Sequence, residues 1–321
     1  MNTRIAFLFP GQGSQAVGMG RALAERYPVA AATFTEADKA LGFAISKLCF
    51  EGPEDELRLT ENTQPAIMTV SVAAWRVLAE HGIQPAMAAG HSLGEWSAHV
   101  AAGTLSFADA VRSVKARGRA MQQAVPAGQG AMAAILQLDA AQVAAACAEA
   151  AAETGLTVAA ANLNSPGQTV ISGAAAAVEQ AAALAKAKGA RRAVMLPVSA
   201  PFHCALMQPA QEEVARVLAG LTLADPGFPV AANVTGRLVA TADDAREALI
   251  RQVTGTVRWV DCVQALATES EVFIEVGPGK VLTGLMKQID PAQKALHVED
   301  PASLEKTLAE ITAIHSASVA T

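Results

Sequence analysis

Charged residues are scarce in this sequence, and the charge that is present is not predominantly basic. Only 17% of the 321 residues are charged, which is below the roughly 25% of ordinary soluble domains. The 24 Lys and Arg residues against 30 Asp and Glu residues leave a net charge of −6. The chain therefore has no general electrostatic attraction for nucleic acid or an anionic lipid surface, and an anionic ligand needs local groups to bind it.

Long apolar runs and clustered cysteines are also missing. No window reaches the ~18 uninterrupted apolar residues of a membrane-spanning helix, and the first apolar run, Ile5 to Phe9, is too short for a signal peptide. The four cysteines lie far apart without a CxxC pair, which argues against a zinc site and against a disulfide framework. These features predict a cytoplasmic protein that binds no metal and does not enter a membrane.

At about 150 residues per domain, a chain of this length is expected to contain roughly two structural units. From residue 131 to 197, the pattern reads strand, helix, strand, strand, helix, strand, which is the ferredoxin-like order. On either side, strands alternate with helices, as in a mostly parallel sheet covered on both faces. The sequence thus predicts an α/β core of residues 1–127 and 199–321, with an inserted ferredoxin-like subdomain at 128–198.

One turn carries the strongest chemical signal of the chain. Gly90-His91-Ser92-Leu93-Gly94 is a GxSxG sequence between an expected strand at 86–89 and an expected helix at 95–102. This is the context in which the motif exposes a nucleophilic serine, with glycines where side chains would clash. The start of the helix would also stabilise negative charge beside Ser92. A Gly-Ser loop is the alternative, and the flanking strand and helix favour the nucleophile.

A serine hydroxyl needs a base, and the chain has six histidines. His91 is adjacent to Ser92 in the backbone and is expected to turn away from it. Four others are expected to be structural, namely His81, His99, His297 and His315. His203 lies in the loop that returns from the inserted subdomain, where functional residues concentrate. His203 is therefore the predicted base.

A helix predicted at 107–124 places one arginine unusually. Arg117 falls at the border of the apolar face, away from the charged face that carries Arg112, Lys115 and Arg119. Such an arginine binds an anionic group, forms a structural salt bridge, or extends its charged end to solvent past the apolar face, and the pattern leaves these alternatives open. Earlier in the chain, a helix is predicted from Pro65 to Glu80, because proline is tolerated in the first turn of a helix.

The glycine-rich turn after the first strand has two interpretations. Gly11, Gly13 and Ala16 match the GxGxxG/A dinucleotide fingerprint. The match is weak because no acidic residue follows at the end of a second strand. The turn is better suited to directing a backbone N–H at a developing oxyanion.

Together, these segments resemble the malonyl-CoA:acyl carrier protein transacylases. The resemblance covers nearly the whole chain and rests on GQGSQ at 11–15, GHSLGE at 90–95, Arg117, NSPGQ at 164–168, APFH at 200–203 and EVGPGKVLTGL at 275–285. It implies an α/β-hydrolase-like core with an inserted ferredoxin-like subdomain. It also implies transfer of malonyl from malonyl-CoA to the phosphopantetheine thiol of an acyl carrier protein, in fatty acid or polyketide biosynthesis, without a metal or bound cofactor.

The resemblance further implies a role for each site residue. Ser92 would be acylated, and His203 would be its base. The remaining roles are an oxyanion hole from the backbone amides of Gln12 and Leu93, a malonyl carboxylate site at Arg117, and a backbone carbonyl of Gln252 that orients the histidine. Phe202 resembles the residue found in malonyl-selective polyketide acyltransferases. An acyl hydrolase with the same Ser-His dyad is the alternative, and it would differ only in admitting water.

Overall fold

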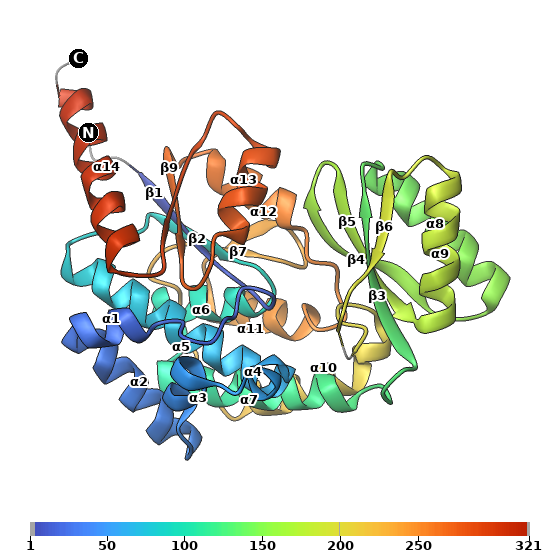
Figure 1. Ribbon diagram of the computed structural model, residues 1–321, viewed down its shortest axis with the longest axis horizontal. Helices are drawn as coiled ribbons and strands as arrows, with labels where there is room; N and C mark the ends of the chain where they lie inside the picture. The colour runs from blue at the N-terminus through green and yellow to red at the C-terminus, as the bar shows by residue number, and fades with distance from the viewer. Residues whose placement is uncertain (1–3, 199, 320–321) are drawn as a thin grey trace.

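The computed structural model describes residues 4–198 and 200–319, which form two lobes, each built around one sheet (Figure 1). The strands of the larger sheet are β1 (Ile5–Phe9), β2 (Met87–Gly90), β7 (Val230–Ala232), β8 (Arg237–Val239), β9 (Val272–Val276) and β10 (Lys294–Val298). Their order is β10-β9-β1-β2-β7-β8, and every neighbouring pair except β7 and β8 is parallel. This confirms the predicted α/β core with a mostly parallel sheet.

Strand β1 lies inside this sheet and is buried on both faces. Successive side chains of a strand point to opposite sides. Accordingly, Phe7 and Phe9 pack into the larger apolar cluster, while Ala6 and Leu8 pack into a second cluster on the other face. The uninterrupted apolar run at the start of the sequence is thus a strand covered by helices on both sides.

Helices surround the larger sheet and connect its strands. They are α1 (Arg21–Arg26), α2 (Pro28–Leu41), α3 (Ile45–Glu51), α4 (Glu54–Arg58), α5 (Thr60–Glu80), α6 (Leu93–Ala101), α7 (Phe107–Gln123), the short 3₁₀ helix η1 (Ala205–Met207), α10 (Gln208–Ala219), α11 (Ala242–Arg251), α12 (Trp259–Ala267), α13 (Val281–Ile289) and α14 (Pro301–Val319). None of the helices within residues 4–198 and 200–319 is both long and apolar enough to cross a membrane.

Helix α5 corrects one expectation, because it begins at Thr60 and contains Pro65 in its interior. Proline removes one hydrogen bond from a helix. Most of α5 is buried, and it packs so closely on α7 that a Cβ on Gly118 would lie 2.7 Å from the carbonyl oxygen of Thr60. Tertiary packing therefore outweighs the local cost of the proline.

The smaller lobe contains β3 (Gly130–Leu136), β4 (Val158–Ser165), β5 (Gln168–Ala174) and β6 (Arg192–Met195), with α8 (Ala140–Thr154) and α9 (Ala175–Ala187) between them. The sheet is antiparallel in the order β4-β5-β3-β6, and its two helices pack on one face. The element order is the predicted ferredoxin-like one. The limits of the subdomain at 128 and 198 stay a prediction, and the boundary residue Ser199 lies outside the described residues.

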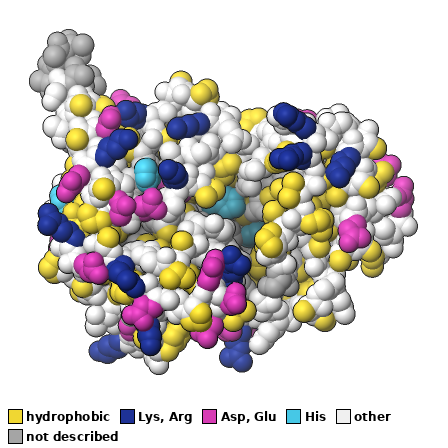
Figure 2. Space-filling view, in the orientation of Figure 1, with side chains coloured by type: hydrophobic (Ala, Val, Ile, Leu, Met, Phe, Trp, Pro, Cys, Tyr) yellow, Lys and Arg dark blue, Asp and Glu magenta, His cyan; other side chains and the backbone are white. Residues whose placement is uncertain are grey.

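The opposite face of the smaller sheet looks toward the larger lobe. Met132 and Val170 on that face join the main apolar cluster. Figure 2 shows a hollow between the two lobes, with histidine side chains at its floor. The site described below lies where the lobes meet.

The turn between β2 and α6 is as tight as the GxSxG motif requires. A Cβ on Gly90 would lie 1.8 Å from the carbonyl carbon of Gly94, and one on Gly94 would lie 2.0 Å from the carbonyl oxygen of Phe9. Real Cβ atoms do not approach backbone so closely, so only glycine fits. The turn is thereby pressed against the end of β1.

We expect Gly94→Ala to destabilise the protein by about 1–3 kcal/mol or more, because the new methyl group overlaps backbone that has no room to move. Gly284 is the matched control, since it lies exposed in α13 with open space around the position of a Cβ. Gly284→Ala is expected to stabilise by roughly 0.5–1 kcal/mol through helix propensity. Denaturant unfolding measures both changes, and equal effects of the two variants would contradict the packing argument.

Candidate active site

Ser92 occupies the turn between β2 and α6 in a strained backbone conformation. Its φ is 51° and its ψ is −106°, a region that residues with a Cβ rarely adopt and that clusters at functional sites. In the described part of the chain, the non-glycine residues with positive φ are Ser92, Gln137 and His203. The two residues predicted as nucleophile and base are therefore both held in unusual conformations.

The structure brings Ser92 and His203 together. Ser92 Oγ lies 2.7 Å from His203 Nε2, and His203 Nδ1 lies 2.9 Å from the backbone oxygen of Gln252. A carbonyl oxygen only accepts hydrogen bonds, so Nδ1 carries the proton and Nε2 accepts from the Ser92 hydroxyl. Burial, and then the charge of Arg117, lower the pKa of His203 to about 3. The imidazole is therefore neutral near pH 7 and able to accept a proton.

Arg117 is more deeply buried than the helical pattern predicts. Its side chain is 1% exposed, because α5 and the end of α11 close over the border of the α7 apolar face. Nη1 donates to Gln64 Oε1 at 2.7 Å, and Nη2 donates to Gln252 Oε1 at 2.8 Å and to Ser92 Oγ at 3.1 Å. Burial lowers the pKa of Arg117 to about 10, against the opposing effect of Glu95, so the guanidinium remains charged.

The guanidinium forms no salt bridge with the described residues. Its hydrogen-bond acceptors are two amides and one hydroxyl, and its Nε has no partner among the described residues. A buried cation with neutral partners at the wall of a pocket is able to accept an anionic ligand. The geometry thus favours anion binding over the structural ion pair that the sequence left open.

A pocket of about 190 Å³ opens above Ser92. Gln12, Leu93 and Phe202, each singled out from the sequence, line it together with Ser92, Arg117 and His203. The smaller lobe contributes an apolar and amide-bearing wall. The remaining lining residues are Gln64, His91, Met121, Met132, Asn162, Asn164, Val170, Leu196 and Val198.

Several polar residues of the site escaped the sequence analysis. Ser92 N–H donates to Asn233 Oδ1 at 2.7 Å, and Glu95 Oε2 accepts from the Asn233 N–H and from Gln252 Nε2. Burial raises the pKa of Glu95 to about 7 despite these hydrogen bonds and the nearby Arg117. Glu95 and Asn233 are completely buried. An acidic residue inside an apolar helix, and an asparagine directly after a buried strand, were the available signals.

His91 is turned away from Ser92, as expected. Its Nε2 is bonded to Asn164 Oδ1 at 2.8 Å rather than to Ser92, but the ring still lines the pocket. Burial lowers the pKa of His91, so it contributes a neutral polar group to the wall. His91 is thus turned away from the nucleophile without leaving the site.

The other four histidines lie outside the pocket. His99 is buried against Thr104 Oγ1, and burial lowers its pKa to about 4. His81 and His315 each bond a backbone oxygen one turn earlier in their own helix, and His297 faces Glu299. None of the four lines the pocket at Ser92, which agrees with the structural roles expected for them.

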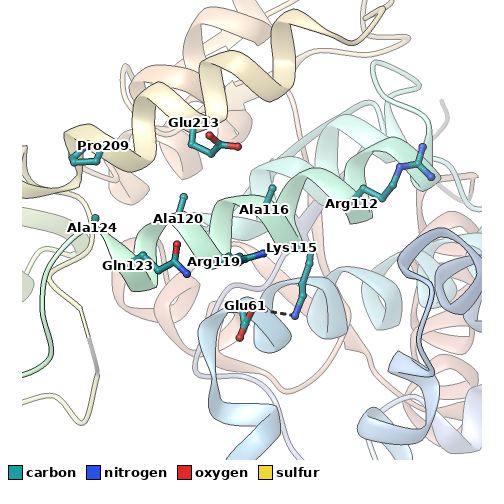
Figure 3. Close-up of a pocket in the computed structure, with 10 residues that line it drawn as sticks. All are labelled: Glu61, Arg112, Lys115, Ala116, Arg119, Ala120, Gln123, Ala124, Pro209 and Glu213. Carbon is teal, nitrogen blue, oxygen red and sulfur yellow. Dashed lines mark ion pairs between the residues drawn. The ribbon is translucent and has the colours of Figure 1, made fainter.

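A larger and shallower groove runs along the outer side of α7, facing α10 (Figure 3). Arg112, Lys115 and Arg119 line it, and Lys115 forms an ion pair with Glu61 there. The groove contains no serine, cysteine or histidine. Helix α7 therefore separates a charged outer face, as the helical pattern predicted, from a buried face that carries Arg117, which the pattern had placed only at the border. Within the described ranges, no three His, Cys, Asp or Glu side chains are grouped as ligands for a metal ion.

Comparisons with known proteins agree with this geometry. Residues 6–312 match the family described as acyl transferase domain. The chain is 50% identical to the malonyl CoA-acyl carrier protein transacylase of Salmonella typhimurium over 310 residues, which cover 96% of this chain and 100% of that protein. An acyl carrier protein S-malonyltransferase from Vibrio cholerae has a TM-score of 0.92 at 50% identity, covering 95% of this chain and 100% of the other.

A further solved structure holds a type II PKS acyl carrier protein in complex with its malonyl-transacylase. That match has a TM-score of 0.93 at 46% identity and covers 96% of this chain and 100% of the other. Identity of this extent over nearly the full length of several relatives, together with the family match, leads to one assignment. The chain belongs to the malonyl-CoA:acyl carrier protein transacylase family of acyl transferases.

Proposed function

We propose that this protein transfers a malonyl group from malonyl-CoA to the phosphopantetheine thiol of an acyl carrier protein, through a malonyl ester on Ser92. The observation that carries the proposal is that Ser92 Oγ is bonded both to the base His203 and to the guanidinium of Arg117. A malonyl thioester would present its carbonyl carbon to Ser92 Oγ, from which His203 takes the proton, and its carboxylate to Arg117. The names of the relatives support the same reaction.

The first half-reaction acylates the enzyme. His203 Nε2 accepts the hydroxyl proton as Ser92 Oγ attacks the thioester carbonyl, and the imidazolium then protonates the departing CoA sulfur. The C–S bond breaks and a C–O bond forms, so that CoA leaves as a thiol and malonyl-Ser92 remains. The second half-reaction reverses this order, with the carrier protein's thiol as the attacking group. Ping-pong kinetics follow from the covalent intermediate.

Two backbone amides are proposed to stabilise the tetrahedral intermediates. Leu93 is the first residue of α6 and Gln12 follows β1, and both line the pocket beside Ser92. An N–H at a helix start favours negative charge, and preorganised donors of this kind contribute strongly to acyl transfer. The Gln252 carbonyl holds the His203 ring through Nδ1, so that Nε2 stays directed at Ser92.

Arg117 is proposed to bind the malonyl carboxylate. A guanidinium forms two parallel hydrogen bonds with a carboxylate, which are stronger than bonds between neutral groups. Desolvation in the buried site strengthens them further. This contact would distinguish malonyl from acetyl, because an acetyl thioester has no carboxylate.

The proposed chemistry uses only side chains and backbone amides, and we expect the reaction to need no metal or bound cofactor. The partners are malonyl-CoA and an acyl carrier protein, in fatty acid or polyketide biosynthesis. We place the protein in the cytoplasm, since its four cysteines are free and buried thiols, which is typical of a reducing compartment.

Mass spectrometry of the intact protein after mixing with malonyl-CoA tests the function. The wild type is expected to gain one malonyl group, and Ser92→Ala none, because Ser92 Oγ is the hydroxyl bonded to His203 Nε2 among the described residues. His203→Ala should slow transfer to the carrier protein by ~10² to 10⁴. An adduct on Ser92→Ala would overturn the nucleophile, and release of malonate in place of transfer would establish the hydrolase.

Arg117→Ala is expected to lower kcat/KM for malonyl-CoA about 10- to 150-fold more than kcat/KM for acetyl-CoA. This range corresponds to the loss of a charged hydrogen bond of ~1.5–3 kcal/mol. Any disturbance of Ser92 itself affects both thioesters, so the ratio isolates the carboxylate. Arg119→Ala, on the exposed outer face of α7, is the control and should leave the ratio unchanged. Equal losses for malonyl and acetyl in Arg117→Ala would make Arg117 structural.

Phe202 is proposed to exclude branched acyl groups, because it lines the pocket directly before the catalytic base. A misfit methylene typically costs about 1–3 kcal/mol, or roughly 10- to 200-fold. We expect Phe202→Ser to raise methylmalonyl relative to malonyl transfer by a factor in this range, while malonyl transfer is largely kept. Phe202 also packs in the apolar cluster, so thermal unfolding is measured in parallel. Lower stability with an unchanged substrate ratio would show that the ring serves only packing.

A further inference from the structure

Glu95 stands at a position where a glutamate often caps the start of a helix, but it does not cap α6. Ser92 is the N-cap of α6, so Glu95 is the third helical residue, and in a capping box such a glutamate accepts from the N–H of the N-cap residue. Here the Ser92 N–H donates to Asn233 Oδ1 instead. Glu95 Oε2 accepts from the Asn233 N–H at 3.0 Å and from Gln252 Nε2 at 2.7 Å. The carboxylate therefore faces into the protein, toward the site.

The amide of Gln252 connects this carboxylate to the guanidinium. Its Nε2 donates to Glu95, and its Oε1 accepts from Arg117 Nη2 at 2.8 Å. A carboxylate can only accept and a guanidinium can only donate, so the amide has one orientation that satisfies both neighbours. All three side chains are at most 1% exposed, and water does not substitute for either partner.

We propose that Glu95 is a positioning residue for malonyl binding, which acts through the Gln252 amide to hold the Arg117 guanidinium beside Ser92. The inference rests on the proposed function, because it concerns the carboxylate end of that substrate. It adds a residue that touches neither the substrate nor the reacting atoms. It also gives Gln252 a side-chain role that is separate from the contact of its backbone carbonyl with His203.

The intervening amide explains how a buried carboxylate supports Arg117 without blocking it. A direct ion pair would have to be broken or shared when the malonyl carboxylate arrives. With Gln252 between them, the negative charge still favours the buried cation, while none of the acceptors bonded to Arg117 is charged. The guanidinium is thereby fixed in place and remains available to an anion.

The test compares kcat/KM for malonyl-CoA and acetyl-CoA at about pH 8, where Glu95 is ionised. Glu95→Gln preserves size but removes the charge and the constraint on the amide, and we expect the malonyl to acetyl ratio to fall about tenfold. Glu275→Gln is the matched control. Glu275 is also buried, but its donors among the described residues are Leu282 and Thr283 at the start of α13, so its replacement should lower stability and leave the ratio unchanged.

Gln252→Leu provides a second variant. It removes the amide that connects Glu95 to Arg117 and keeps the backbone carbonyl that is bonded to His203. Its ratio should fall as in Glu95→Gln, and the double variant should show no further fall. In an Arg117→Ala background, Glu95→Gln should not change the ratio at all, because residues that act through one another are not additive.

These experiments separate failure of the proposed function from failure of the positioning role of Glu95. A wild type that forms no malonyl enzyme refutes the proposed function itself. A wild type that transfers malonyl, with Glu95→Gln losing malonyl and acetyl activity equally, overturns the positioning role and leaves the function standing. In that case Glu95 would only support the Ser92 turn through Asn233. An effect of Glu95→Gln on the ratio that persists without Arg117 would overturn the proposal as well.

Discussion

The buried charge of Arg117 is the constraint around which the site is built. An uncompensated cation in a protein interior costs several kcal/mol, and its hydrogen-bonding groups must be satisfied as well. The chain meets this demand with buried polar side chains drawn from separate helices, Gln64 from α5 and Gln252 from the end of α11. The close approach of α5 and α7 at Gly118 brings the first of these within reach. Ser92, the proposed nucleophile, also accepts from the guanidinium, so the same arrangement that stabilises the charge places it beside the oxygen proposed to react.

The same charge shapes the chemistry of the dyad. Arg117 and burial both lower the pKa of His203, and the group that accepts from its Nδ1 is a neutral carbonyl rather than a carboxylate. An adjacent carboxylate would favour the imidazolium and would also attract Arg117 away from the substrate. A carbonyl fixes the tautomer without adding a negative charge. A backbone carbonyl in place of a carboxylate at His203 Nδ1 is thus consistent with a site that keeps one guanidinium available for an anion.

The sequence was informative where local rules decide structure. Glycines at 90 and 94 have a steric reason that is visible in the motif, and the β-α-β-β-α-β order needs only the spacing of apolar residues. It was less informative where distant segments meet. The burial of Arg117 depends on α5 packing over α7. The periodicity of α7 alone gives no information about that packing. The Gln252 carbonyl could be assigned only by resemblance, since every residue has such a group. Glu95 lies in the GHSLGE segment, yet its partners Asn233 and Gln252 lie more than 130 residues away along the chain.

The pocket at the junction of the two lobes is expected to determine which nucleophile reaches the acyl ester. A Ser-His dyad serves hydrolysis and transfer equally well, so the difference lies in which nucleophile reaches the ester. Met132 and Val170 come from the smaller sheet, on the face that α8 and α9 leave uncovered, and they form an apolar wall opposite Ser92 and Arg117. The apolar side chains of this wall suit contact with a thioester arm, and the amides of Asn162 and Asn164 beside them can bond its polar groups. The uncovered face of the inserted subdomain therefore supplies a binding surface to the pocket of an α/β-hydrolase-like core, and we expect this surface to favour transfer of the malonyl group over its release.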